Sequence, residues 1–370
     1  MKRLLPYAAA ALCILYVVSW LRSDPKVDYP AFYSAGRLFR EHKSVYDLSA
    51  QCALQLEVSE RGCLPYPHPP LLLPLMALTA VDNFKIAHFL YGLFVLLLFV
   101  ACVVPLVKIT HSKLHALVLL TFLPVQQAIN STQSTPLVLL GVLLMVLFLR
   151  ERRDFLAGLC LALACVKPHI ALALGVPLLF TRPKAFFGFM VGGSALVVYS
   201  LLLVGPSGLK GLANIMIVMS RGEGFFINRH MMHNLTGIVY RFDLPTWPVW
   251  PAYVLGIVSI SFLWRKLDIS LPTIGIAVVL VVFTAPHLHL HDLSLLMIPM
   301  LALPVWVPLL ATTLLVGSFG TPFLYGASYL IQVSLAIACA KRFASHLERF
   351  SPGSRSIRPT PAPSNSLPAA

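Results

Sequence analysis

The chain has 370 residues, of which 58% are hydrophobic and only 11% are charged, and its mean hydropathy is +0.81. A soluble domain carries roughly 25% charged residues, so this composition excludes a soluble enzyme and indicates an integral membrane protein. The formal net charge of +14 would suggest nucleic-acid binding in a soluble protein. Here the basic residues stand at the ends of apolar segments, as the positive-inside rule requires, and no nucleic-acid partner is expected.

The apolar segments predict an all-α, polytopic membrane protein with about 10–12 transmembrane helices. Within residues 1–20 the basic pair Lys2-Arg3 precedes an apolar stretch, as in a secretory signal. No Ala-x-Ala-type cleavage site closes the segment, so we interpret it as an uncleaved first span. Residues 84–107 and 186–204 are each long enough to cross the hydrocarbon core. Residues 1–345 are expected to form one membrane domain, and the Ser/Pro-rich residues 346–370 a disordered cytoplasmic tail.

The basic clusters define the expected orientation. They stand at residues 2–3, 108–113, 150–153, 182–184, 265–266 and 341–342. With all of them in the cytoplasm, the first loop, residues 21–64, is extracytoplasmic. Cys52 and Cys63 share this loop, and they could form a disulfide if it faces an oxidising compartment.

Two segments are interrupted by proline. Residues 65–81 are short and carry Pro74, which favours a partly inserted or re-entrant helix. Residues 155–180 are basic at both ends and are broken by Lys167-Pro168, so we expect a hairpin of two half-helices that presents Lys167 toward the outer leaflet. Residues 114–129 are expected to form one span, and residues 209–238 an outer loop with an amphipathic stretch.

Polar residues that are difficult to explain as solvated loops map to the outer side or just beneath it. An ionisable group near hydrocarbon is costly unless it is paired or lines a cavity, so this set predicts a shared polar site. The set comprises Asp28, Tyr33, Arg37, Tyr46, Tyr66, His68, Gln133, Lys167, Asn228, Arg229, His230, His233, Asn234, His287, His289, His291 and Asp292.

Several of these residues have simpler explanations. Asp28 could cap the helix that begins near Pro30, and Lys167 could extend along the helix to the interface. The sequence "HLHLHD", residues 287–292, is compatible with zinc, but no further ligand cluster is evident. We therefore favour hydrogen bonding or phosphate contact for these histidines and expect neither a metal nor a cofactor.

Six motifs in order resemble the glycosyltransferase family 87, whose members are GT-C-type membrane enzymes that use polyprenyl-phosphate sugars. The motifs are "DYPAFYSAGRLF…VYD", "YPHPPLLLPLMAL", "QSTPLVLLGVLLMVLFL", "AGLCLALACVKPHIALALGVPLLF", "HNLTGIVYR" and "APHLHLHDLSLLMIPMLAL". The resemblance spans about residues 27–303. It implies that Asp28 is the catalytic base, that Lys167 matches the lysine after the short half-helix, and that His289 or His291 lies near the lipid phosphate.

The chemistry of such a transfer is compatible with these residues. Asp28 would take the proton of the acceptor hydroxyl. Lys167, Arg229, His287, His289 and His291 would stabilise the phosphate leaving group. The substrate pocket is expected to include Tyr33, Tyr46, Tyr66, His68, Gln133, Asn234 and Asp292.

The expected function is therefore transfer of a sugar, mannose or another hexose, with inversion from a polyprenyl-phosphate donor to a lipid or glycan acceptor. The active site would face the extracytoplasmic side of the plasma membrane. A transporter or flippase of a lipid-linked or polar substrate is an alternative, because transporters also place ionisable residues beside broken helices. A membrane acyltransferase that uses a histidine of residues 287–292 as its base is another.

Overall fold

The computed structural model describes residues 5–22, 28–59, 62–221, 229–318 and 321–350, and within these ranges the chain is helical without any strand. Asn228 and residues 351–370 of the predicted tail lie outside the described residues. Helix α17 continues through the predicted tail boundary at residue 345.

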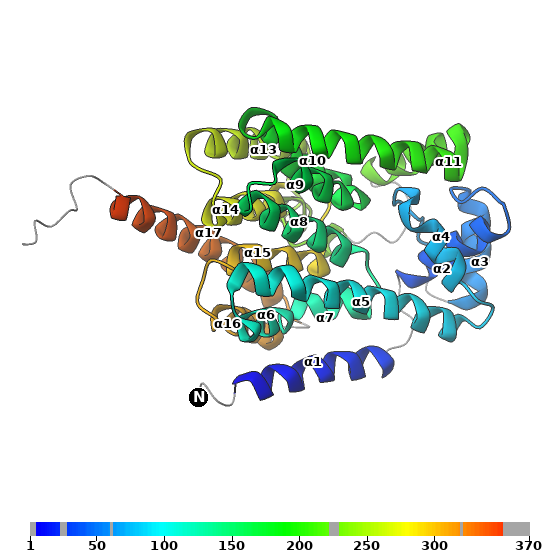
Figure 1. Ribbon diagram of the computed structural model, residues 1–370. Helices are drawn as coiled ribbons and strands as arrows, with labels where there is room; N and C mark the ends of the chain where they lie inside the picture. The colour runs from blue at the N-terminus through cyan, green and yellow to red at the C-terminus, as the bar shows by residue number, and fades with distance from the viewer. Residues whose placement is uncertain (1–4, 23–27, 60–61, 222–228, 319–320, 351–370) are drawn as a thin grey trace, which may run out of the picture.

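The α-helices follow one another along the chain as shown in Figure 1. They are α1 (Leu5–Arg22), α2 (Tyr29–Arg40), α3 (Leu48–Val58), α4 (Leu73–Thr79), α5 (Phe84–Thr110), α6 (Lys113–Leu120), α7 (Leu123–Asn130), α8 (Thr135–Arg150), α9 (Asp154–Leu161), α10 (Pro168–Thr181), α11 (Pro183–Arg221), α12 (Leu235–Arg241), α13 (Val249–Lys266), α14 (Leu271–Thr284), α15 (Met297–Met300), α16 (Val307–Ser318) and α17 (Phe323–Phe350). Short 3₁₀ helices are η1 (Pro70–Leu72), η2 (Ala162–Val166), η3 (Arg229–Met231) and η4 (Leu290–Leu296).

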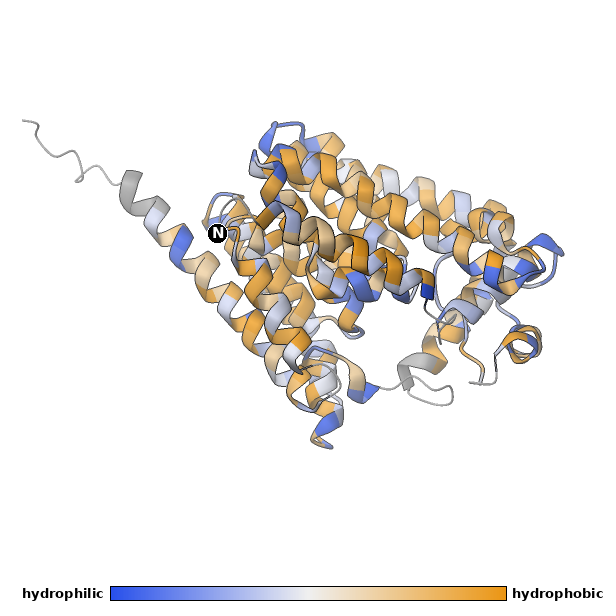
Figure 2. Ribbon diagram, turned by 90° about the horizontal axis from the view of Figure 1, so that it is seen from below, coloured by the Kyte–Doolittle hydropathy of each residue, from blue (hydrophilic) through white to orange (hydrophobic). Residues whose placement is uncertain are grey.

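Four helices in the described ranges are long and apolar enough to cross a membrane, namely Leu5–Arg22, Phe84–Thr110, Pro183–Val218 and Phe323–Ser345. Hydrophobic residues cover the helices, and hydrophilic residues gather in loops at the ends of the molecule (Figure 2). The protein is therefore a polytopic helical membrane protein, as the composition predicts. The other apolar helices are 10–17 residues long, so the total of about 10–12 crossings stays a prediction.

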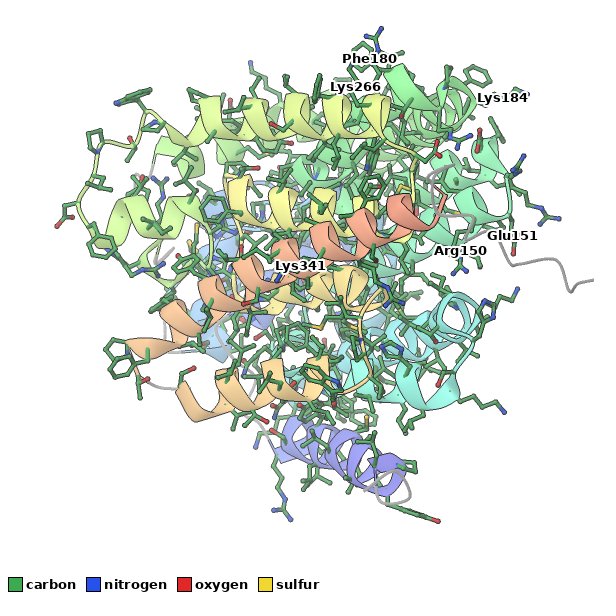
Figure 3. The ribbon with its side chains drawn as sticks, turned by 90° about the vertical axis from the view of Figure 1, so that its left-hand side faces the viewer. Arg150, Glu151, Phe180, Lys184, Lys266 and Lys341 are labelled. Carbon is green, nitrogen blue, oxygen red and sulfur yellow. A yellow bond between two sulfur atoms is a disulfide. The ribbon has the colours of Figure 1, made fainter. Side chains whose placement is uncertain are left out.

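Several of the predicted cytoplasmic clusters gather at one end of the molecule. Helices α2, α3 and α4 form one end (Figure 1). Figure 3 looks onto the opposite end, where Arg150, Lys184, Lys266 and Lys341 all lie. Four of the predicted cytoplasmic clusters thus share one face, as the positive-inside rule requires of loops on the same side.

The predicted hairpin is present. Helix α9 and η2 run up to Lys167, whose backbone leaves the helical region at φ −124° and ψ 82°, and α10 begins at Pro168. Proline suits the first turn of α10 because its missing N–H would have no partner there. The break places the lysine side chain inside the molecule.

Two predicted segments differ in the structure. Residues 114–129 form two helices, α6 and α7, because the chain turns at Thr121 and Pro124 stands in the first turn of α7. The expected loop at residues 209–238 is helical up to Arg221, because α11 continues beyond a kink at Gly205. Gly205 has φ +66° and Pro206 follows it, so α11 consists of two helical segments that meet at this kink.

The helices α2 and α3 hold the extended segment that leads to the cavity. In α3, Gln55 accepts a hydrogen bond from the Leu64 N–H (2.9 Å) and donates one to its carbonyl (2.7 Å), and Gln51 accepts the Tyr66 N–H (2.8 Å). The disulfide that the sequence allowed joins Cys52 to Cys63. These links fix residues 64–68 as one wall of the cavity.

Candidate active site

A cavity of about 1790 Å³ lies among η2, α10, α12, α13 and the segment before η4. It is larger than the roughly 300–1,000 Å³ of a typical small-molecule pocket, so it has room for two substrates or for one long one. The predicted site residues that line it are Asp28, His68, Gln133, Lys167, Arg229, His233, His287, His289 and His291. Residues from distant parts of the chain thus converge on one site.

Asp28 is fixed by a side chain rather than acting as a helix cap. Its carboxylate makes no hydrogen bond to the N-terminus of α2, so the cap interpretation is not supported. Instead Gln133 Nε2 donates to Asp28 Oδ2 at 2.7 Å. Burial raises the pKa of the Asp28 carboxyl, and the Gln133 hydrogen bond together with His289 and Lys167 acts in the opposite direction.

Lys167 is buried, with 5% of its surface exposed, and it does not extend to the interface. Its ammonium pairs with the Asp292 carboxylate and lies 3.4 Å from His291 Nε2. Asp292 is fully buried and does not line the cavity. Asp292 therefore does not lie in the substrate pocket, where the sequence predicts it. It contacts Lys167 from behind the cavity wall.

The three histidines of residues 287–292 line the cavity together. The ring centroids of His287 and His289 are 4.8 Å apart, and those of His289 and His291 are 5.9 Å apart. Burial lowers the pKa of both His287 and His289, and burial with the nearby charge of Lys167 lowers that of His68 to about 3. At neutral pH these imidazoles are neutral, so they can both donate and accept hydrogen bonds.

The cavity lining also contains apolar and aromatic side chains. They include Leu172 of α10, Met216 of α11, Trp250 and Tyr253 of α13, and Leu324 of α17. Leu172, Met216 and Trp250 have 47%, 42% and 55% of their surface exposed. The cavity is therefore amphiphilic.

Arg229 lies on the wall formed by η3 and α12. Its guanidinium donates to the Tyr240 hydroxyl and stacks over the Tyr240 ring, with the guanidinium carbon 4.9 Å from the ring centroid. Arg229 and Tyr240 both line the cavity. A second cationic group thus faces the cavity from a different element than Lys167.

Four other predicted pocket residues support the walls without lining the cavity, namely Tyr33, Tyr46, Tyr66 and Asn234. Tyr33 packs against Phe84 of α5, and Tyr46 donates to the His68 carbonyl at 2.9 Å. Tyr66 donates to the Pro69 carbonyl at 3.1 Å. Asn234 caps α12 by accepting the Gly237 N–H at 3.2 Å. Each of these side chains is buried by apolar packing or by a hydrogen bond to nearby backbone. Residue type alone does not show whether such a side chain lines the cavity or supports its wall.

The sequence prediction missed part of the lining. His169 directly follows the Lys167-Pro168 break and lines the cavity, and the Tyr253 hydroxyl donates to the His169 carbonyl. Its position two residues after Lys167, in the first turn of the second half-helix, is a sequence signal that would have placed it near the same site. The aromatic lining residues, in contrast, have the composition of an ordinary membrane-interface belt.

No group of three or more His, Cys, Asp or Glu side chains in the described ranges is arranged to hold a metal ion. The three histidines of residues 287–291 and Asp28 line the cavity, but they serve different partners: His291 lies beside Lys167, and Asp28 is bonded to Gln133. The geometry thus does not support the zinc alternative at residues 287–292.

The fold and the cavity together define a polytopic membrane protein with an internal amphiphilic site. The model of glycosyltransferase family 87 matches residues 66–286, which is more than half of the chain. The chain therefore belongs to glycosyltransferase family 87, as its motifs predict, and is a glycosyltransferase. No curated protein and no solved structure matches the chain.

The matched range includes Gln133, Lys167 and Arg229, but it begins after Asp28 and ends before His287. The roles of Asp28 and of the three histidines therefore depend on the geometry of the cavity rather than on the match.

Proposed function

We propose that this glycosyltransferase transfers a hexose, with mannose as the first candidate, from a polyprenyl-phosphate donor to an extracytoplasmic lipid or glycan acceptor. The observation that carries the proposal is the position of Asp28. Gln133 holds its carboxylate in the wall of a cavity that is also lined by Lys167, the histidines, and apolar and aromatic side chains.

The amphiphilic cavity supports a lipid-linked donor. A nucleotide sugar is polar along its whole length, whereas a polyprenyl-phosphate sugar has a polar head and a hydrocarbon chain. The exposed side chains of Leu172, Met216 and Trp250 line the cavity together with its charged and polar residues. We expect a prenyl chain to contact these apolar side chains while its sugar phosphate meets the polar ones.

The reaction requires one base and one group that stabilises the leaving phosphate. Asp28 takes the proton of the acceptor hydroxyl while that oxygen attacks the anomeric carbon. The bond between the anomeric carbon and the phosphate oxygen breaks, and polyprenyl phosphate leaves with the electron pair. Lys167, Arg229 and the N–H groups of the histidines meet the charge that develops on the phosphate.

The extracytoplasmic orientation has two supports. The Cys52–Cys63 disulfide favours an oxidising compartment for the end that carries α2 and α3. The basic residues Arg150, Lys184, Lys266 and Lys341 lie at the other end, which the positive-inside rule assigns to the cytoplasm. Both support an orientation in which the end that carries α2 and α3 faces outward, in keeping with the proposed extracytoplasmic site.

The proposal is tested with membranes that contain the wild type, Asp28→Asn or His289→Ala, together with membranes that lack the protein. They are incubated with radiolabelled polyprenyl-phosphate mannose and a lipid extract, and label is followed from the donor into a new product. Wild-type membranes should form the product, and Asp28→Asn should reduce the rate by at least about 100-fold, because an amide cannot accept the proton.

The other outcomes separate the alternatives. An acyltransferase with a histidine base would lose activity in His289→Ala and remain indifferent to Asp28→Asn. A transporter would move the lipid between leaflets and leave its sugar attached. If the wild type consumes no polyprenyl-phosphate sugar, the proposed donor is wrong.

A further inference from the structure

Asp292 joins three separate elements behind the cavity wall. Its Oδ1 atom accepts a hydrogen bond from Thr135 Oγ1 at 2.7 Å and pairs with the Lys167 ammonium. Its Oδ2 atom accepts the His289 backbone N–H at 3.1 Å and lies 3.4 Å from His291 Nε2. One carboxylate thus links the start of α8, the break between η2 and α10, and the start of η4.

The carboxylate lies out of reach of a substrate. Asp292 and Thr135 are each 0% exposed, and neither lines the cavity. Lys167 does line the cavity, although only 5% of its surface is exposed. A substrate can therefore touch Lys167 but neither of the two residues behind it.

The contacts restrict the direction of the lysine ammonium. An ammonium group has three N–H donors. In the described part of the chain its partners are Asp292 Oδ1, behind the cavity wall, and His291 Nε2, in the wall itself. These two contacts fix the ammonium at the wall, and the remaining N–H is left for a substrate group. A lysine side chain has several rotatable bonds, and without such partners it would lose this direction.

We propose that Asp292, held in place by Thr135, is a positioning residue that directs the Lys167 ammonium toward the leaving phosphate. The proposal builds on the proposed function, because it assigns Lys167 to the phosphate of the donor. Asp292 orients this cation and neutralises it before the donor binds, and Thr135 fixes the carboxylate.

The arrangement explains a buried ion pair in an apolar protein. Burying two charges costs free energy that a pair often fails to recover, so such a pair is weak support for stability alone. Preorganised charge is valuable where a transition state develops the opposite charge, because no reorganisation is needed at that moment. The main effect of the ion pair between Asp292 and Lys167 is thus to orient the ammonium, and its contribution to the stability of the fold is smaller.

The first test uses two buried threonines whose hydroxyls form hydrogen bonds to remote elements. Thr135→Val removes the bond to Asp292 and nearly preserves shape. Thr312→Val is the control, because Thr312 of α16 donates to the Thr121 carbonyl at 3.2 Å, accepts the Leu123 N–H at 3.2 Å and does not line the cavity. We expect Thr135→Val to lower kcat by about 10-fold with KM for the donor changed by less than about 3-fold. Thr312→Val should leave both constants unchanged while lowering the melting temperature at least as much.

The second test asks whether Asp292 acts through Lys167. Asp292→Asn, Lys167→Met and the double variant are compared in purified form. We expect each single variant to lower kcat by about 100-fold or more, and the double variant to be no slower than Lys167→Met. If Asp292 merely caps η4, the decrease in kcat caused by Asp292→Asn should add to that of Lys167→Met in the double variant.

The outcomes distinguish this proposal from the proposed function. Additive losses in the cycle, or a Thr135→Val enzyme with wild-type kcat, would overturn the positioning role while transfer by the wild type still stands. Failure of the wild type to use any polyprenyl-phosphate sugar would instead overturn the proposed function. If Asp292→Asn does not fold, the threonine pair still decides the question.

Discussion

At Asp28, burial and hydrogen bonding act on the same carboxyl group in opposite directions. Burial raises its pKa, and the Gln133 N–H, His289 and Lys167 favour its ionised form. Burial is the largest of these effects. A base with a raised pKa is a stronger proton acceptor, and enzymes commonly adjust catalytic carboxylates in this way.

The raised pKa predicts the pH dependence of transfer. Asp28 can accept a proton only when ionised, so activity should be full above its pKa and lost as pH falls through it. Because that pKa is raised, the acid limb of the kcat profile should lie above the ordinary value for aspartate, about 3.9. Single-turnover rates measured between pH 4 and about 9 would show this limb, and a flat profile across this range would contradict the role.

Replacing Gln133 gives a matched prediction. Gln133→Leu removes the donor at 2.7 Å from Asp28 Oδ2, so the ionised form loses stabilisation and the pKa of Asp28 rises further. We expect the acid limb to move to higher pH by about 1 unit, with kcat on the high-pH plateau reduced much less. The same pH–rate measurement on Gln127→Leu, a cavity residue not bonded to Asp28, serves as the control.

At the scale of the helices, α9 and α11 pack at unusually short distance. A Cβ atom on Gly158 would lie 1.7 Å from the Ala185 carbonyl oxygen, and one on Gly188 would lie 2.1 Å from that of Phe155. Small residues allow this approach in membrane proteins. The contact holds η2, and through it the Lys167 break, against the rest of the bundle.

Two glycines of α11 therefore respond differently to a methyl group. Gly188→Ala should separate α9 from α11 and lower the melting temperature, at a cost of about 1–3 kcal/mol. Gly193 has no atom within 4 Å of the added Cβ, so Gly193→Ala should be neutral or stabilising by up to about 1 kcal/mol. Thermal unfolding in detergent compares the two, and equal effects would refute this packing.

The disulfide between Cys52 and Cys63 closes a loop with a sequence separation of 11 residues. Its loss in the Cys52→Ser/Cys63→Ser variant should cost about 2–3 kcal/mol. Because α3 holds residues 64–68, KM for the donor should rise as well. Cys160→Ser, at a free cysteine in α9, is the control. If the melting temperature and KM of the double variant are unchanged, the hydrogen bonds of Gln51 and Gln55 are sufficient to hold residues 64–68 without the disulfide.

How far the sequence predicts these elements depends on whether a local signal exists. The break at Lys167-Pro168 is predicted because proline acts on its immediate neighbours. The division of residues 114–129 and the continuation of α11 beyond Gly205 depend on packing, and proline and glycine alone do not determine whether a helix ends or kinks. The polar character of Asp28, Lys167 and the histidines predicts that they converge on one site. It does not distinguish Asp292 behind the wall from His289 on it, because only the three-dimensional contacts separate them.

For the whole molecule, the composition of its two ends predicts their orientation. Lys85 stands in the first turn of α5, and this helix begins near the end that carries α2–α4 (Figure 1). Glu151 lies at the basic end (Figure 3). In a background without free cysteines, Lys85→Cys should react with a membrane-impermeant maleimide in intact cells. Glu151→Cys should react only after permeabilisation. The reverse pattern would place the site on the cytoplasmic side.

The cavity also constrains the stereochemistry of transfer. Within the described ranges, Asp28 is the only carboxylate that lines it, since Asp292 is paired with Lys167 behind the wall. A retaining transfer by two displacements needs a nucleophile in addition to the base, and in glycoside hydrolases that nucleophile is a second carboxylate. One accessible carboxylate therefore favours a single displacement.

The most direct measurement is the anomeric configuration of the product that the purified wild type forms from a polyprenyl-phosphate sugar of known configuration, determined by NMR. We expect a product with the opposite configuration, formed in one displacement with Asp28 as the base. A product that keeps the configuration of the donor would require a covalent intermediate or a different mechanism. That result would contradict the role of Asp28 as the base of a single displacement.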